Sequence, residues 1–162
     1  MGVSGSGKST LGQLLAEALG CPFIEGDDLH CPNNVEKMRS GQPLNDDDRW
    51  PWLDRLGKAL HDATEAHGLA VAACSALKYR YRERLVDAIA APTSFVMLET
   101  DRAELVRRMG SRAGHYMPAS LLDSQLAALE RPHGGERALI LDANASPEAL
   151  CSASRDWLVG NG

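Results

Sequence analysis

The sequence predicts an α/β fold in which helices cover both faces of a parallel β-sheet. Short apolar runs typical of buried strands alternate along the chain with longer segments of helical periodicity, which is the pattern of βαβ units. The 162 residues suit one domain, and 44% hydrophobic with 24% charged residues is an ordinary globular composition. We therefore expect residues 1–162 to form a single domain.

The expected strands and helices alternate along most of the chain. Phe23 and Ile24 with their neighbours predict a strand, and further strands are expected at 69–74, 94–99 and 138–141. Apolar spacing predicts helices over 10–19, 46–67, 79–90, 101–111, 119–130 and 147–159. Ligands of such folds bind at the carboxyl ends of the strands, so we expect the functional residues there.

The first ten residues contain a phosphate-binding loop. Residues 2–9 match the pattern G-x-x-x-x-G-K-[ST] in full, and glycines let backbone N–H groups approach phosphate oxygens. Lys8 is expected to contact the β- and γ-phosphates, and the Ser9 hydroxyl is expected to bind Mg²⁺. The residues expected to bind ATP are Gly2, Val3, Ser4, Gly5, Ser6, Gly7, Lys8, Ser9 and Thr10.

A strand normally comes directly before such a loop, but this sequence begins at Met1, one residue before the motif. The first strand of the expected sheet is therefore missing from this sequence. Three explanations stay open: a true start further upstream, a truncation, or a fold that tolerates a gap in its sheet. If the strand is absent, we expect a poorly ordered loop and weak affinity for ATP.

Several polar residues are candidates for binding the second substrate. Asp27 follows the strand at 23–25, where a carboxylate can orient a hydroxyl group, although a turn or helix-capping role is the alternative. The planar guanidinium of Arg49 suits a carboxylate or phosphate, while the neighbouring Asp46 most simply caps a helix. Lys78 and Arg82 follow another strand and are expected either to hold an acidic substrate or to face solvent.

The stretch 110–118, rich in Gly, His and Arg, is the best candidate for a mobile lid, which we expect around 108–120. An arginine there, Arg112, would stabilise charge on the transferred phosphoryl group. His115 is expected either to contact the substrate or to pack within the lid.

Charge and cysteine content exclude several classes of function. Lys and Arg total 17 against 22 Asp and Glu, a net charge of −5, so we expect no nucleic-acid and no membrane partner. No apolar run approaches the ~20 residues that span a bilayer. The 4 cysteines are scattered without a C-x-x-C pair, which favours a cytoplasmic location over a zinc site or a disulfide framework.

Taken together, these motifs resemble the P-loop gluconate kinases. The most specific blocks lie between His30 and Met38, between Asp48 and Leu53, and between Ser75 and Lys78. The similarity extends over positions 2 to 132 and includes the phosphate loop, Gly26-Asp27, Leu29-His30, Asn34, Lys37-Met38, Gly41, Pro43-Leu44, Asp46, Asp48-Arg49, Pro51-Trp52-Leu53, Cys74-Ser75-Ala76-Leu77-Lys78, Tyr81-Arg82, His115-Tyr116-Met117-Pro118, Leu121-Leu122, Ser124-Gln125, Leu129-Glu130 and Pro132.

The resemblance implies a nucleoside-monophosphate-kinase-like fold with a moving lid, frequently a homodimer. It implies ATP-dependent phosphorylation of the 6-hydroxyl of D-gluconate to 6-phosphogluconate. By the same resemblance Lys8, Asp27 and Arg112 are the catalytic residues, and Ser9 binds the metal. The expected substrate-binding residues are Asp27, His30, Arg49, Lys78, Arg82 and His115.

Two other interpretations stay open at this point. In the first interpretation, the chain is another small-molecule kinase of the same fold, such as a shikimate-like or nucleotide kinase. In the second it is a nucleotide-binding module inactivated by N-terminal truncation, although Lys8, Ser9 and Asp27 are all present. A GTP-dependent switch is disfavoured because the sequence has no N-K-x-D guanine-binding motif.

Overall fold

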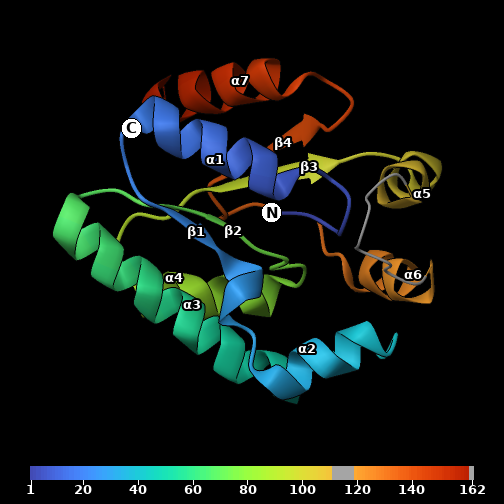
Figure 1. The fold of residues 1–162 in the computed structure, drawn as a ribbon. Helices are drawn as coiled ribbons and strands as arrows, with labels where there is room; N and C mark the ends of the chain where they lie inside the picture. The colour runs from blue at the N-terminus through green and yellow to red at the C-terminus, as the bar shows by residue number, and fades with distance from the viewer. Residues whose placement is uncertain (111–118, 161–162) are drawn as a thin grey trace.

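The computed structural model describes residues 1–110 and 119–160, and it confirms the predicted α/β fold. Helices α1 (Lys8–Leu19) and α7 (Pro147–Gly160) pack together on one side of the strands (Figure 1). Helices α3 (Asp46–His67) and α4 (Tyr79–Ile89) pack together on the other side. The strands thus form the middle of three layers.

The strands differ from the expected single sheet. β1 (Phe23–Glu25) pairs in parallel with β2 (Val71–Ala73), and β3 (Phe95–Glu99) pairs in parallel with β4 (Ala138–Asp142). Within the described residues these are two separate two-stranded sheets. β2 is shorter than the predicted 69–74, because only its middle residues have a partner strand.

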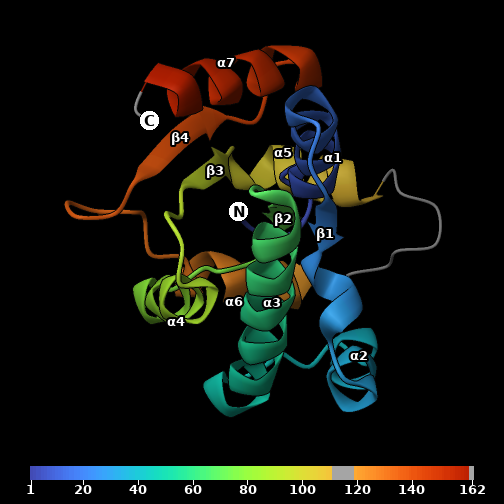
Figure 2. The ribbon, with the colours of Figure 1, turned by 90° about the vertical axis from the view of Figure 1, so that its left-hand side faces the viewer.

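Met1 lies beside β3, between the two sheets (Figure 2). Its amine donates a hydrogen bond to the Val96 carbonyl, and its own carbonyl accepts one from the Leu98 N–H at 2.9 Å. This pattern places Met1 opposite Met97 in a parallel ladder. A cavity of about 500 Å³ with mainly apolar lining, including Ala73 and Val96, occupies the space between β2 and β3.

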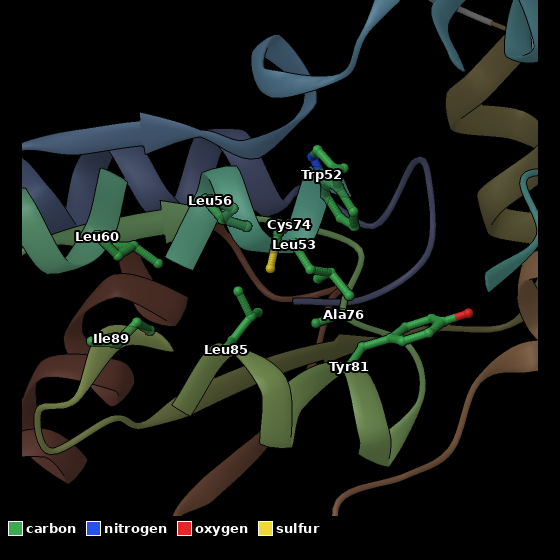
Figure 3. Close-up of a cluster of buried hydrophobic side chains, with 9 residues drawn as sticks. All are labelled: Trp52, Leu53, Leu56, Leu60, Cys74, Ala76, Tyr81, Leu85 and Ile89. Carbon is green, nitrogen blue, oxygen red and sulfur yellow. The ribbon is translucent and has the colours of Figure 1, made fainter. Parts of the chain in front are cut away.

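The largest apolar core lies between α3 and α4 (Figure 3). Gly57 lets the two helices approach closely, since a Cβ there would lie 2.5 Å from the Ala88 Cβ. Burial of large apolar side chains is the main stabilising contribution to such a helix pair. The core consists of Trp52, Leu53, Leu56, Leu60, Cys74, Ala76, Tyr81, Leu85 and Ile89.

The remaining helices gather at the carboxyl ends of the strands. The 3₁₀ turn η1 (Gly26–Leu29) follows β1 and leads to α2 (Pro32–Arg39), a short helix that the sequence did not predict. α5 (Arg102–Gly110) follows β3, and α6 (Ala119–Ala128) lies near it (Figure 1). Together they form the edge at which the phosphate loop lies.

Capping residues define both ends of α3 and the carboxyl end of α1. Asn45 and Asp48 form a capping box at the start of α3, and Gly68 ends that helix in the left-handed conformation. Gly20 ends α1 in the same way. None of the helices in ranges 1–110 and 119–160 is long and apolar enough to cross a membrane.

Candidate active site

The phosphate loop begins directly after Met1, beside β3, and enters α1 through three glycines with positive φ. Gly2, Gly5 and Gly7 have φ angles of 138°, 82° and 97°, which other residues rarely adopt. Space is also restricted, because a Cβ on Gly2 would lie 2.7 Å from the Leu98 carbonyl oxygen. A Cβ on Gly5 would lie 3.0 Å from the Met109 side chain in α5. The glycines of the motif are therefore required by the backbone and by its neighbours.

The start of α1 directs backbone N–H groups toward the loop, where an anion can bind. Gly7 is the N-cap and makes no side-chain cap, so the first-turn amides have no side-chain acceptor there. Lys8 donates from Nζ to the Val3 carbonyl at 3.0 Å, which keeps its ammonium over the loop. The half-buried Ser9 lies in the first turn. These groups fit a polyphosphate chain with an associated cation, as the motif predicted.

Asp27 lies in η1, immediately after β1, and its side chain is exposed. Two contacts fix this turn. The Trp52 Nε1 donates to the Gly26 carbonyl at 2.7 Å, and a Cβ on Gly26 would lie 2.5 Å from the Ala73 carbonyl. Burial raises the pKa of the Cys74 thiol, and the charges of both Lys8 and Asp27 act on it too. Lys8 lines one cavity together with Ala73 and Cys74, and Gly26 lies against the same two residues, so the phosphate loop and the turn that carries Asp27 both lie at the end of β2.

A pocket of about 230 Å³ lies close to this edge and is called the polar pocket here. It is lined by Asp46 and Arg49 of α3, by Lys78 and Tyr81 at the start of α4, and by Gln125 of α6, among others. Arg49 and Lys78 both lie over the Tyr81 ring, with 5.7 and 5.4 Å to its centroid. The structure thus brings together two cations that the sequence placed far apart.

Asp46 is the anion that organises this pocket. Its carboxylate accepts hydrogen bonds from Lys78 Nζ at 2.9 Å, from Arg80 and from the Tyr81 hydroxyl. The hydrogen bonds from Tyr81 and Lys78 hold the pKa of Asp46 below its usual range. The capping role predicted for Asp46 belongs instead to its neighbours Asn45 and Asp48. Its pocket role was not predicted, because nothing in the local pattern connects Asp46 with α4.

Arg49 has no ion-pair partner within the described part of the chain, in contrast to Lys78. Burial lowers the pKa of its guanidinium, and nearby Tyr81, Asp46 and Asp27 oppose that shift. A half-buried guanidinium in this position still carries its charge at neutral pH. Arg49 is therefore the cation of the polar pocket best able to receive an anionic ligand.

His30 stacks on the indole of Trp52, with ring centroids 4.4 Å apart and planes inclined by 14°. Asn34, a buried residue of α2, lies 3.4 Å from the His30 Nδ1 and also donates to the Asp48 carbonyl at 2.8 Å. Burial lowers the pKa of His30 to about 4, despite the nearby charge of Asp27. The imidazole is therefore neutral around pH 7.

Arg82 lies away from the polar pocket, contrary to its predicted place among the substrate contacts. Its guanidinium is 1% exposed and forms a two-point ion pair with Glu136, with Nη2 3.0 Å from Oε2. Nη1 also donates to the carbonyls of Ala76, Leu77 and Glu130. A buried arginine with this full set of acceptors joins α4 to the segment before β4, so we assign it a structural role.

Two further predicted residues, Arg112 and His115, lie outside the described residues, as does most of the expected lid. Gln125 is a residue whose position the sequence did not explain. It donates to and accepts from Ser4 of the phosphate loop, and its only signal in the sequence was its place in the Ser124-Gln125 match.

Comparison with known proteins shows which proteins this chain is similar to. Residues 1–132 match the family model described as an AAA domain. The chain is 48% identical to a gluconokinase of Gluconobacter oxydans over 150 residues, which cover 93% of this chain and 84% of that protein. A crystal structure of a gluconokinase from Sinorhizobium meliloti superposes with a TM-score of 0.88 and 45% identity, covering 98% of this chain and 89% of that one. A shikimate kinase from Aquifex aeolicus covers 99% of this chain and 95% of its own, with a TM-score of 0.64 at 14% identity, which shows the fold alone.

The lowered pKa of His30 predicts a specific pH dependence of stability. The unfolded chain binds a proton near pH 6.5, whereas the folded protein does so only near pH 4. The contribution of His30 to stability is therefore complete above pH 6.5 and is lost as the pH falls toward 4. Urea unfolding between pH 7 and 4.5 should show a shallower loss of stability for His30→Phe than for the parent protein.

The matched control for this experiment is His67→Phe, at an exposed position near the end of α3. The control should keep the slope of the parent protein. A His30→Phe variant whose stability falls as steeply as that of the parent would show that His30 is not the responsible group.

Proposed function

The chain belongs to the gluconokinase family and phosphorylates gluconate, and we propose that it transfers the γ-phosphoryl group of ATP to the 6-hydroxyl of D-gluconate. The products would be 6-phosphogluconate and ADP. The observation that carries the proposal is that Lys8 and the Gly26-Asp27 turn both lie at the end of β2, near a pocket that contains Arg49. This arrangement supports a phosphate donor and an acidic, hydroxyl-bearing acceptor meeting at one edge of the strands.

The donor half of the site would be formed by residues 2–10. The amides of the phosphate loop and of the first turn of α1 would bind the phosphate oxygens, and Lys8 would contact the β- and γ-phosphates. The Ser9 hydroxyl would hold Mg²⁺ together with phosphate oxygens; when bound, the ion neutralises negative charge on the phosphates. Lys8 would leave the Val3 carbonyl for the stronger acceptor.

The acceptor half would be formed by Asp27 and the polar pocket. Asp27 would accept a hydrogen bond from the 6-hydroxyl, aim its oxygen at the γ-phosphorus in line with the leaving group, and take the proton as the bond forms. Arg49 would hold the gluconate carboxylate, because it is the pocket cation without a carboxylate partner in the described residues. Lys78 and the neutral His30 would contact other substrate hydroxyls.

The two alternative interpretations lose support. The likeness to shikimate kinase is limited to the fold at 14% identity, whereas the gluconokinase relative is 48% identical over 93% of the chain. An inactive nucleotide-binding module is disfavoured because Lys8, Ser9 and Asp27 are present and the loop adopts the glycine-dependent backbone that the motif requires.

We further propose that residues 1–162 act as one domain with a lid around 108–120. Arg112 would stabilise the transferred phosphoryl group, and His115 would contact gluconate. The family resemblance favours a homodimer in the cytoplasm that acts on a small molecule, with neither nucleic acid nor membrane as partner. The net charge of −5 and the four free cysteines support this proposal.

A coupled assay of ADP release tests the acceptor directly. With ATP and Mg²⁺ present, we expect turnover with D-gluconate and none with shikimate or nucleoside monophosphates at equal concentration. ³¹P and ¹³C NMR of the product should place the phosphate on carbon 6. Turnover of shikimate or of a nucleotide, without turnover of gluconate, would contradict the assignment.

Asp27→Asn tests the role of the carboxylate that orients the hydroxyl. We expect kcat to fall about 100-fold or more, since general-base and positioning effects are of that size, while ATP binding stays unchanged. Asp28→Asn, at the exposed neighbouring position in η1, is the control and should remain active. Equal kcat for Asp27→Asn and the parent enzyme would remove Asp27 from the mechanism.

Arg49→Ala tests the position of the substrate carboxylate. Removing a hydrogen bond to a charged group should raise KM for gluconate roughly tenfold or more, with little change in KM for ATP. Arg155→Ala, on the exposed surface of α7, is the matched control and should leave both constants unchanged. If Arg49→Ala raised only KM for ATP, Arg49 would belong to the donor half instead.

A further inference from the structure

Gln125 of α6 forms two hydrogen bonds with Ser4 of the phosphate loop. The backbone N–H of Ser4 donates to Gln125 Oε1 at 2.7 Å, and Gln125 Nε2 donates to the Ser4 hydroxyl at 3.1 Å. Both the oxygen and the nitrogen of the Gln125 carboxamide are therefore hydrogen-bonded to Ser4. The bonds join residues 121 positions apart in the sequence.

Ser4 lies in the part of the loop that most needs external support. Gly2 and Gly5 flank it at short range, and glycine has the greatest backbone freedom to lose on ordering. The hydrogen bonds from Ser6 N–H and Lys8 Nζ both end on the Val3 carbonyl, so they stay within the loop and its helix. Gln125 instead connects the loop to a separate helix.

The helix that carries Gln125 is itself held firmly against the loop. Leu122, one turn earlier in α6, is fully buried in a cluster with Val3, Leu77 and Leu105. The chain after α6 is fixed by the Glu130 N–H, which donates to the Leu77 carbonyl at 2.8 Å. A side chain on such an anchored helix can restrict the loop that it contacts.

Gln125 also faces the other half of the site. It lines the polar pocket together with Arg49 and Lys78, the proposed contacts of the acidic substrate. One side chain thus borders the pocket and holds the loop. Phosphoryl transfer needs the two substrates in line, and a displacement of about 1 Å can lower the rate about 100-fold.

We propose that Gln125 is a positioning residue that fixes Ser4, and thereby sets the phosphate loop at the correct distance from the polar pocket. It acts through Ser4 and not by contact with the reacting atoms. The proposal rests on the proposed function for its effect on turnover. Its effect on the loop is independent of the identity of the acceptor.

The test compares Gln125→Ala with Gln13→Ala, which removes the same side chain from an exposed position in α1. We expect Gln125→Ala to lower kcat roughly tenfold or more and to weaken ATP binding about threefold, while KM for gluconate stays within about twofold. Gln13→Ala should match the parent enzyme. Circular dichroism and thermal unfolding of each variant establish that it is folded.

Ser4→Ala supplies the second arm, because it removes the hydroxyl and leaves the backbone N–H bond in place. The double variant Ser4→Ala/Gln125→Ala should be no slower than Gln125→Ala alone, since the bond lost in Ser4→Ala is already absent. Multiplicative effects of the two changes would overturn the proposal. So would a Gln125→Ala variant that changes KM for gluconate alone, because Gln125 would then be a substrate contact.

Binding of a fluorescent ATP analogue separates this proposal from the proposed function. If the parent enzyme bound the analogue but turned over no gluconate, the acceptor assignment would fail, while weaker binding by Gln125→Ala would still support the positioning role. Equal analogue binding by the parent and by Gln125→Ala, together with equal kcat, would contradict the positioning role.

Discussion

The close contact between the phosphate loop and the end of β3 is the constraint on which the rest of the site depends. At Gly2 the backbone passes so near the Leu98 carbonyl that no Cβ fits, and at Gly5 it passes similarly close to Met109 of α5. These two contacts, with the left-handed glycine conformations, direct the chain into α1 and so determine where the helix begins. The position of Lys8 and of the first-turn amides follows from that start.

The other half of the site depends on a different kind of constraint, which is electrostatic. The chain carries a net charge of −5, so an acidic substrate has to be held by local cations. The Asp46 carboxylate accepts hydrogen bonds from Lys78, Arg80 and the Tyr81 hydroxyl. Arg49 lies nearby and has no carboxylate partner among the described residues. The pocket therefore offers one paired and one available cation. It adjoins the core between α3 and α4, in which Trp52 and Tyr81 are buried.

The sequence predicted those features whose cause is local. The phosphate loop, the helices after it and the turn at Asp27 follow from glycine positions and apolar spacing, and the structure has them within a few residues of the expected bounds. Helix α2 was missed because its only apolar side chains, Val35 and Met38, do not form a repeating face. Its one signal was Pro32 at the first helical position.

Features that depend on distant contacts could not be predicted from the sequence. Arg82 follows a strand as Lys78 does, yet its side chain is buried, because Glu136 and three backbone carbonyls accept hydrogen bonds from its guanidinium. The local sequence around Arg82 gives no indication of this ion pair. Asp46 looked like a helix cap because its partners Lys78 and Tyr81 lie more than 30 residues away. The division of the strands into two pairs, with Met1 beside β3, is likewise a matter of tertiary packing.

A crystal structure with a non-hydrolysable ATP analogue, Mg²⁺ and D-gluconate is the most direct test of this account. We expect the γ-phosphate at Lys8 and the start of α1, the gluconate carboxylate on Arg49, and the 6-hydroxyl within about 3 Å of the Asp27 carboxylate. A complex in which gluconate binds with its 6-hydroxyl remote from both Asp27 and the γ-phosphate would contradict it.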